Sequence, residues 1–323
     1  MKMELEERRS FLKKSALGIA GATMLPSFYT GAFAANGATR KYSLCLDTGS
    51  VGVSGSMEEI LDYAIKYGFE SIGASAQQLA EMSEKQLKAL LKKMKKNNIS
   101  WGTSGLTFNF RNDLEAHKAG MKDFTKYTAA LEKAGVTRMS TWILPAHDSL
   151  TYTQNLKLHA DRVREIATVL GDHGIRFGLE YVGPKTFWTS KRYPFVHSMA
   201  ETGDLIAAIG KDNVGYVLDS YHWFCAEESV EDILKLSNKD VVSCDLNDAP
   251  DVPLYEQKDL VRALPMSTGK IDVKAYLDAL IKIGFDGPVR CEPFDKKLNA
   301  MENEPALETT FKSMKKAFDL VDK

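Results

Sequence analysis

Residues 173–180 read His-Gly-Ile-Arg-Phe-Gly-Leu-Glu, in which a glycine ends a helical stretch and an apolar run follows that finishes in a carboxylate. Glycine readily adopts the left-handed backbone that ends a helix. The same kind of junction recurs at 66–69, 133–136 and 282–285. We expect Asn98 and Asn213 to replace the glycine at two more junctions. The spacing is roughly 30–40 residues, which is the size of a βα unit.

Eight such units predict eight parallel strands joined by helices. We expect the strands at 41–47, 69–74, 100–104, 137–143, 176–181, 214–219, 241–246 and 288–292. Strict alternation of strand and helix favours an α/β fold, and eight units match a single-domain (β/α)8 TIM barrel of ~250 residues. An open doubly wound sheet would show a glycine-rich dinucleotide fingerprint after its first strand, and residues 46–50 lack one.

We expect the first 34 residues to be a targeting signal and not part of the barrel, which we place at 35–323. Residues 8–14 read Arg-Arg-Ser-Phe-Leu-Lys-Lys, a short apolar run follows at 16–25, and Ala-Phe-Ala occupies 32–34. This order resembles a bacterial twin-arginine export signal with its cleavage site. The apolar run is shorter than the ~20 residues of a membrane span. We therefore expect a periplasmic or exported protein with no stable membrane span after cleavage.

Composition narrows the possible classes further. Hydrophobic residues make up 44% and charged residues 26% of the 323-residue chain, which is typical of a folded globular protein. The formal net charge of −1 offers no attraction for a phosphate backbone, so nucleic acid is not an expected partner. The four cysteines form no C-x-x-C pair, so a structural zinc site is not expected either.

The last four predicted strands each end in an acid. These residues are Glu180, Asp219, Asp245 and Glu292. The chemistry of a TIM barrel lies at the C-terminal ends of its strands, and neighbouring strands run only ~4.8 Å apart. Four carboxylates so close would repel one another unless a cation neutralised them. Their hard oxygen donors favour Mn²⁺ or Mg²⁺ over Co²⁺ or Zn²⁺.

Aromatic and histidine side chains give weaker indications. Trp142 ends the fourth predicted strand, where it could stack on a bound substrate or simply pack at the barrel mouth. His117, His159 and His173 fall on predicted helices or helix ends, and we expect them to be solvated.

The motifs taken together resemble the xylose isomerase-like TIM-barrel superfamily of sugar-phosphate isomerases and epimerases. The resemblance runs from about the third strand to the end of the eighth, and it is carried by residues 178–185, 218–223, 245–250, 262–265, 269–272, 284–288 and 292–293. It implies that Glu180, Asp219 and Glu292 are metal ligands. Many members have histidine where this chain has Asp245, and we expect this aspartate to bind metal as well. The resemblance further implies that His222 and Arg262 contact the substrate.

The implied reaction is a metal-assisted proton transfer on a free sugar or keto-sugar. In this superfamily the metal polarises a carbonyl, an enediolate forms, and two carboxylates move the proton. Glu180 and Glu292 are the expected acid/base pair, His222 would orient or protonate a substrate oxygen, and Lys185 and Arg262 would bind hydroxyls or an anionic group. Relatives are often dimers or tetramers, so a homo-oligomer is a further expectation.

Two alternatives stay open. The same enolising chemistry would serve a lyase or dehydratase that eliminates a group from a 3-keto-sugar, a glycoside or a polyol. A non-catalytic sugar-binding protein is the second alternative, although such a costly cluster of acids argues for a reaction. The superfamily's zinc endonucleases are disfavoured, because the chain has only six histidines. The substrate, the metal used in the cell and the part played by Asp245 are left undecided.

Overall fold

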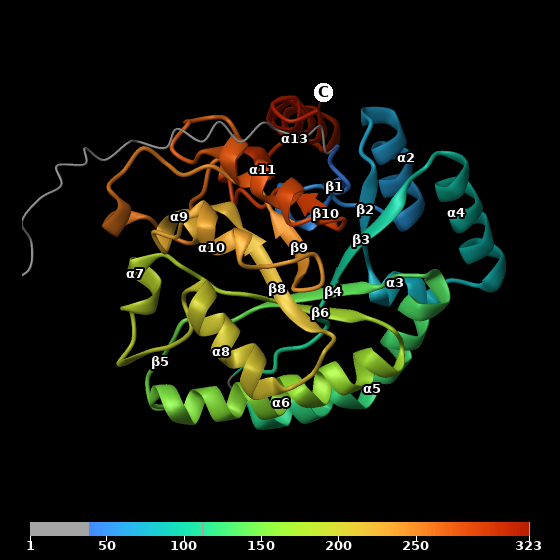
Figure 1. Ribbon diagram of the computed structural model, residues 1–323. Helices are drawn as coiled ribbons and strands as arrows, with labels where there is room; N and C mark the ends of the chain where they lie inside the picture. The colour runs from blue at the N-terminus through green and yellow to red at the C-terminus, as the bar shows by residue number, and fades with distance from the viewer. Residues whose placement is uncertain (1–38, 112, 323) are drawn as a thin grey trace, which may run out of the picture. The chain divides into compact units, whose positions relative to one another are not determined.

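The computed structural model describes residues 39–111 and 113–322, which belong to one compact unit. Eight parallel strands close into a barrel in the order β1-β10-β9-β8-β6-β4-β3-β2 (Figure 1). This confirms the predicted (β/α)8 fold. The strands are β1 (Ser43–Leu46), β2 (Ser71–Ala74), β3 (Ser100–Gly105), β4 (Arg138–Trp142), β6 (Arg176–Glu180), β8 (Val214–Asp219), β9 (Val241–Asp245) and β10 (Pro288–Arg290). The predicted export signal, residues 1–34, lies outside the described residues.

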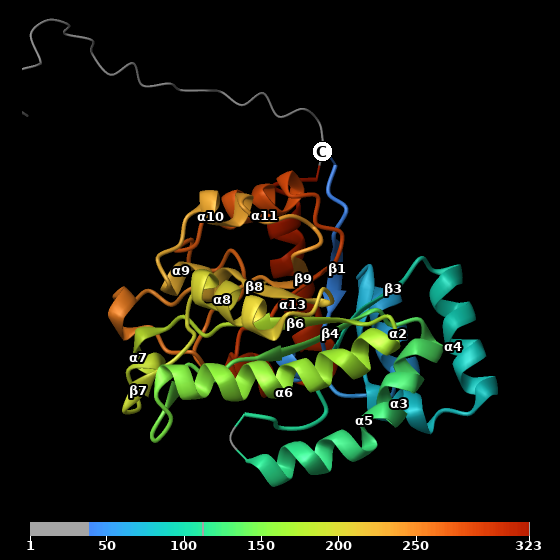
Figure 2. The ribbon, with the colours of Figure 1, turned by 60° about the horizontal axis from the view of Figure 1, so that its bottom comes forward.

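Helices surround the strands on the outside (Figures 1 and 2). The main ones are α2 (Met57–Tyr67), α3 (Ala76–Glu81), α4 (Glu84–Lys96), α5 (Leu114–Ala134), α6 (Tyr152–Asp172), α8 (Met199–Ile209), α11 (Val273–Lys282) and α13 (Asn303–Phe318). Shorter elements lie in the loops: η1 (Gly49–Val51), α7 (Lys185–Trp188), α9 (Ser220–Cys225), α10 (Val230–Leu234), η2 (Leu254–Glu256) and α12 (Lys296–Asn299). None of the helices in the described ranges is both long enough and apolar enough to cross a bilayer.

The predicted helix ends are largely confirmed. Gly68 and Gly135 end α2 and α5 in the left-handed conformation, with φ of 92° and 79°. Asn98 also takes a positive φ, of 55°. The expectation for Asn213 was wrong, because Gly210 takes the left-handed position at the end of α8. Asn213 instead donates two side-chain hydrogen bonds to carbonyl oxygens of the preceding unit and so ties β8 to it.

The core fills the barrel and the layer between strands and helices. Along α6, Ala160, Val163, Ile166 and Leu170 are buried at helical spacing, so one face of this helix packs on the barrel. Inside the barrel the room is limited at Gly178, where a Cβ atom would lie 2.7 Å from Val217 Cγ2. Such a contact is too close for any side chain, so the glycine is what lets β6 approach its neighbours.

A small antiparallel sheet lies apart from the barrel. It pairs β5 (Ala146–His147), which follows β4, with β7 (Tyr193–Pro194), which follows α7. The two segments come from consecutive loops at the C-terminal ends of β4 and β6. Their pairing fixes these loops to each other, next to the end of the barrel where the acids gather.

Candidate metal and active site

Strand register brings the acids to one height. Glu180, Asp219 and Asp245 are the last residues of β6, β8 and β9, and Asp219 is the direct register partner of Asp245. Glu292 follows β10 by two residues. Parallel strands in a closed barrel finish at the same rim, so strand ends alone are enough to make these side chains converge.

The structure brings all four predicted acids together. One carboxylate oxygen from each lies within 4.8 Å of the others. Asp219 and Asp245 are fully buried, Glu180 is nearly so, and Glu292 is half-buried with a side chain 17% exposed. Asn247 supports the group, because its amide donates to both oxygens of Asp219 and its Oδ1 accepts from the Glu292 backbone N–H. The cluster is therefore a fixed feature of the barrel rim.

Two arginines balance part of this negative charge. Arg262 Nη1 donates to Asp219 Oδ2 at 2.5 Å and to Glu292 Oε2 at 3.1 Å, and its Nη2 donates to Asp259 at 2.8 Å. Arg290 binds both oxygens of Asp245 and also reaches Asp47. Six acids thus face two guanidinium groups in this region. The excess of negative charge is suited to a further cation.

Glu180 is the acid that these arginines leave free. Its buried Oε1 has no hydrogen-bond partner among the described residues. Burial raises the pKa of Glu180 well above its usual range, and the neighbouring charge of Glu292 raises it further. An unpaired buried carboxylate oxygen is costly. Together with the all-oxygen donor set, it shows that these residues fit a divalent cation.

Two other acids of the cluster titrate far from their usual range. Burial raises the pKa of Asp219 to about 6, although the Arg262 charge opposes the rise. Burial likewise raises the pKa of Glu292 to about 7, again against Arg262. Carboxyl groups with pKa values near neutrality can both accept and donate a proton under physiological conditions, which suits acid/base work.

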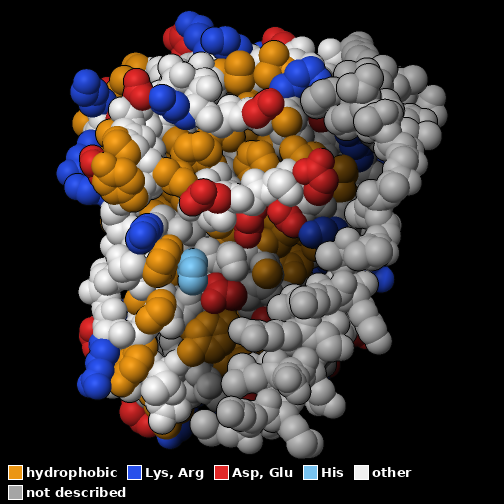
Figure 3. Space-filling view, turned by 60° about the vertical axis from the view of Figure 1, so that its left-hand side comes forward, with side chains coloured by type: hydrophobic (Ala, Val, Ile, Leu, Met, Phe, Trp, Pro, Cys, Tyr) orange, Lys and Arg blue, Asp and Glu red, His pale blue; other side chains and the backbone are white. Residues whose placement is uncertain are grey.

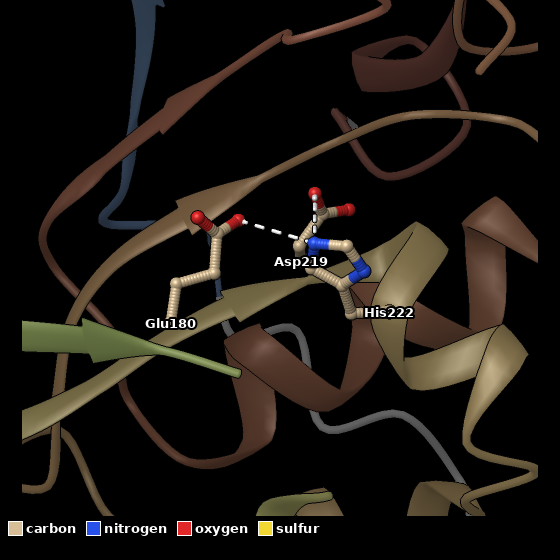
Figure 4. Close-up of side chains that lie close together, drawn as sticks. All are labelled: Glu180, Asp219 and His222. Carbon is tan, nitrogen blue, oxygen red and sulfur yellow. Dashed lines mark ion pairs between the residues drawn. The ribbon is translucent and has the colours of Figure 1, made fainter. Parts of the chain in front are cut away.

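His222 faces the same acids from α9. Its Nε2 lies 3.7 Å from Glu180 Oε1 and 3.9 Å from Asp219 Oδ2 (Figure 4). Burial and the nearby Arg262 hold the pKa of His222 well below its usual range, so the ring is neutral. Its Nδ1 accepts from the Gly183 N–H at 3.3 Å. Arg262 Nη2 also lies 3.1 Å from Nε2, and since a neutral imidazole has only one acceptor nitrogen, Nδ1 and Nε2 do not both accept at once.

A cavity of about 220 Å³ opens beside the cluster. Glu180, Glu292 and Arg290 form part of its wall, and Trp142, which is 39% exposed, forms another part together with Arg111. The surface in Figure 3 shows acidic side chains set among apolar ones on the face that carries the loops around α7 and α9. A small molecule in this cavity would contact both the acids and an aromatic ring.

A family model matches residues 61–317, which cover the barrel from α2 to α13. The chain belongs to the xylose isomerase-like TIM barrel family. The resemblance in the sequence motifs is thereby confirmed, and the four clustered acids Glu180, Asp219, Asp245 and Glu292 lie within the matched range. Membership in this family fixes the fold but not the reaction.

Two curated relatives have different activities. An inosose isomerase of Bacillus velezensis is 24% identical over 269 residues, which cover 82% of this chain and 93% of the relative. A 3-dehydroshikimate dehydratase of Pseudomonas aeruginosa is 25% identical over 145 residues, but these cover only 44% of this chain and 22% of that protein. Both relatives are enzymes, and they support a sugar-modifying enzyme here.

A solved structure of the family contains a metal. The crystal structure of the IOLI protein, described with a bound zinc atom, superimposes with a TM-score of 0.71 at 22% identity. The match covers 86% of this chain and 99% of that one. At this identity the likeness establishes the shared barrel. The acid cluster of this chain fits a divalent metal and leaves its identity open.

The remaining predicted residues lie in different surroundings. Arg262 is buried and its hydrogen bonds go to acids, to His222 and to the Asp259 backbone, so it frames the cluster. Lys185 is exposed on α7, with its Nζ 6.0 Å from the Trp188 ring, and it is not part of the cavity wall. Contact of either residue with a substrate remains a prediction, as does stacking of a sugar on Trp142.

Sequence reasoning misplaced the helical histidines. His117 and His159 are not solvated but are 2% and 1% exposed. His159 packs against Phe110 and Phe195, and burial lowers its pKa to about 4, so it is a neutral core residue. His173 is half-buried and pairs with Glu132. The helical periodicity that places these positions on inward faces would have been the correct signal.

Proposed function

We propose that this protein is a divalent-metal-dependent isomerase or epimerase of a free sugar or keto-sugar. The observation that carries the proposal is the group of four carboxylates, three buried and one half-buried, of which Glu180 and Glu292 line a cavity for a small molecule. Among the described residues, Glu180 Oε1 has no hydrogen-bond partner. So many desolvated charges destabilise a fold, and a chain retains such a cluster for function.

Glu180, Asp219 and Glu292 would hold the cation. Asp245 is the least available of the four, because the Arg290 guanidinium binds both of its oxygens. Arg262 binds only one oxygen of Asp219, and the other accepts from the uncharged Asn247 amide and the Tyr221 N–H. When bound, a divalent metal polarises a carbonyl and makes the adjacent C–H group acidic. Mn²⁺ and Mg²⁺ suit the oxygen donors best.

Glu180 and Glu292 are the proposed acid/base pair. Glu180 stands on β6 and Glu292 follows β10, with β8 and β9 between them in the barrel order. This separation allows the two carboxyl groups to reach a small substrate from different sides. Their raised pKa values let one remove the proton next to the carbonyl and the other return a proton to the enediolate. Neutral His222 would orient the substrate oxygen.

Elimination is the second candidate reaction. In an elimination, the same enediolate would expel a leaving group attached to the next carbon. Glu292, with a pKa of about 7, could protonate that group. The similarity to a dehydratase supports this alternative. A sugar-binding protein without turnover is the third reading, and it predicts tight sugar binding with no product.

Incubation in heavy water separates the three readings. The full-length protein, loaded with Mn²⁺, is incubated with a panel of ketoses and keto-sugars and followed by NMR. Solvent deuterium at the carbon next to the carbonyl, with no group released, supports isomerisation or epimerisation, whereas release of water or an aglycone supports elimination. Loss of turnover in Glu180→Gln by about 10²–10⁴-fold, with Mn²⁺ still bound to the variant and with Glu81→Gln unchanged, assigns the base. Exchange that survives in Glu180→Gln contradicts the proposal.

We also propose that the protein acts outside the cytoplasm and self-associates. The location is supported by the residues at 8–34 alone, and the cargo of such a signal would meet unphosphorylated sugars more often than phosphorylated ones. Cell fractionation of the Arg8→Lys/Arg9→Lys variant tests it, because retention in the cytoplasm is expected. Light scattering of the mature protein measures its oligomeric state.

A further inference from the structure

The cavity beside the acid cluster has a cationic wall that the proposed reaction does not use. Arg111 lies in the stretch between β3 and α5 and reaches across to the end of β4. Its Nε and Nη2 donate to the Trp142 carbonyl at 2.9 and 2.6 Å, and Nη2 also donates to Thr141 Oγ1 at 2.7 Å. The guanidinium carbon lies 4.0 Å from the centre of the Trp142 ring. The group is thus fixed along one edge and stacked on the indole.

No carboxylate in the described part of the chain binds Arg111 directly, although Glu180 acts on it from a distance. The residue is only 7% exposed, yet within residues 39–111 and 113–322 no ion pair involves it, and its Nη1 makes no hydrogen bond. Arg262 and Arg290, at the same end of the barrel, each bind carboxylates directly. Buried charged groups are normally paired, because the loss of hydration must be offset. Because Nη1 is free at the cavity wall, it can donate a hydrogen bond to an anion bound in the cavity.

The same cavity joins Arg111 to the acids. Glu180, Glu292 and Arg111 all line it, and the charge of Glu180 is close enough to act on Arg111. Glu180 and Glu292 are the residues to which we assign the metal and the proton transfer. A ligand that fills this cavity therefore has one end at the reacting centre and another within reach of Nη1.

We propose that Arg111 binds a carboxylate of the substrate, so that the protein acts on a sugar acid or an oxidised keto-sugar that carries a carboxylate. This inference rests on the proposed function, whose substrate class it narrows. A carboxylate matches the single free nitrogen, since one of its oxygens accepts from Nη1 in a charge-assisted hydrogen bond.

A phosphate group fits the cavity less well. It is larger and more highly charged, and it needs several donors, whereas only one nitrogen of Arg111 is free. The volume of about 220 Å³ also lies below the ~300–1,000 Å³ of pockets for larger ligands, which suits a monosaccharide without an added phosphate. The acidic charge nearby further disfavours a dianion.

Binding measured by calorimetry tests the inference without any need for turnover. The Mn²⁺-loaded full-length protein is titrated with glucuronate, with glucose as its neutral counterpart, and with glucose 6-phosphate. We expect glucuronate to bind at least about 10-fold more tightly than glucose, as one charged hydrogen bond allows. Arg111→Met should lose that preference, so that glucuronate binds no more tightly than glucose, and Arg111→Lys should restore part of it.

Arg162→Met is the matched control. Arg162 donates to the Phe110 carbonyl beside Arg111 but is not part of the cavity wall, so the variant removes the same charge from the same region. Circular dichroism checks that all variants are folded. Glucuronate that binds no more tightly than glucose in the wild type overturns the inference, as does an equal loss of both ligands in Arg111→Met. If glucose 6-phosphate binds more tightly than glucuronate and Arg111→Met loses this preference, the inference is overturned and the group that Arg111 binds is a phosphate.

The outcome is independent of the proposed reaction. If Glu180→Gln keeps full exchange in heavy water, the acid/base assignment fails while the calorimetry still reports on Arg111. If the calorimetry shows no preference for glucuronate but exchange depends on Glu180, only the substrate class fails. Repeating the titration on metal-free protein shows whether the anion is held by Arg111 or by the added Mn²⁺.

Discussion

Arg290 donates hydrogen bonds to both carboxylate oxygens of Asp245: Nε lies 2.5 Å from Oδ1 and Nη2 lies 2.9 Å from Oδ2. The two residues are register partners on β10 and β9. The third nitrogen, Nη1, reaches Asp47 Oδ2 at the end of β1, at 2.6 Å. One guanidinium therefore ties together three neighbouring strands of the barrel and neutralises part of the charge next to the proposed metal ligands.

Removal of Arg290 should destabilise the fold strongly. Arg290→Met leaves the buried Asp245 without its counter-ion, and breaking a buried pair from one side lowers the free energy of unfolding by about 3–5 kcal/mol. Urea denaturation of the metal-free protein measures the change. Arg192→Met serves as the control, because Arg192 is exposed and contacts the Tyr193 ring. The double variant Asp245→Asn/Arg290→Met should regain stability relative to Arg290→Met, and a strictly additive double variant would contradict the pairing.

The positions of the acids were predictable because each follows from one repeated pattern. A short apolar run that ends in a carboxylate appears in four successive units, and parallel strands bring those ends together. The pairing of Arg262 and Arg290 with these acids was not predictable, because no repeated pattern marks it. Arg290 stands inside the run Val-Arg-Cys-Glu, where alternation makes it look ordinary, and its importance depends on register with Asp245.

Arg111 and Asp47 show a second limit of the sequence. Arg111 belongs to no motif, and it reaches the cavity only because the stretch after β3 passes over the end of β4. Asp47 directly follows β1, and it pairs with an arginine 243 positions later in the chain. Contacts of this kind depend on how loops lie in space, which periodicity does not encode.

Glu180→Gln should make the metal-free protein more stable while it abolishes turnover. The carboxylate is buried among like charges, and a neutral amide of the same shape relieves both the desolvation and the repulsion. We expect a gain of about 1–2 kcal/mol at pH 8, where the ionised form is most costly. Thermal unfolding in a chelator measures it, with Glu81→Gln for comparison. A loss of stability would show that the ionised carboxylate stabilises the folded state.

Glu228 should give the folded state a pH dependence outside the acid cluster. Its carboxylate accepts from the Met199 N–H at 2.6 Å and from the Tyr181 hydroxyl, and burial raises its pKa to about 7 from 4.5. A raised pKa means that the folded state holds the proton more tightly than the unfolded state. Ionisation therefore costs stability, and the cost grows as the pH rises from 4.5 to 7 and is constant above.

The variant Glu228→Gln removes this titration and keeps a side chain that can bond to both partners. Its stability relative to the wild type should increase by about 1–3 kcal/mol between the two ends of that pH range. Denaturation of both proteins at several pH values in a chelator measures the difference in their free energies of unfolding. The titration of the acid cluster is the same in both proteins and cancels in this difference. A difference that does not change with pH would mean that Glu228 ionises in the folded state as it does in the unfolded chain.

Divalent metal should stabilise the folded protein through the acids at the barrel rim. Mn²⁺ at 100 times its dissociation constant adds about 2.7 kcal/mol to the free energy of unfolding of a protein that binds it only when folded. We expect the shift in the full-length protein after treatment with a chelator, and its loss in Glu180→Gln/Glu292→Gln. Asp245→Asn should keep most of it, because Arg290 already occupies both oxygens of Asp245. Equal shifts in the wild type and the double glutamine variant would place the metal elsewhere, and complete loss in Asp245→Asn would make this aspartate a principal ligand.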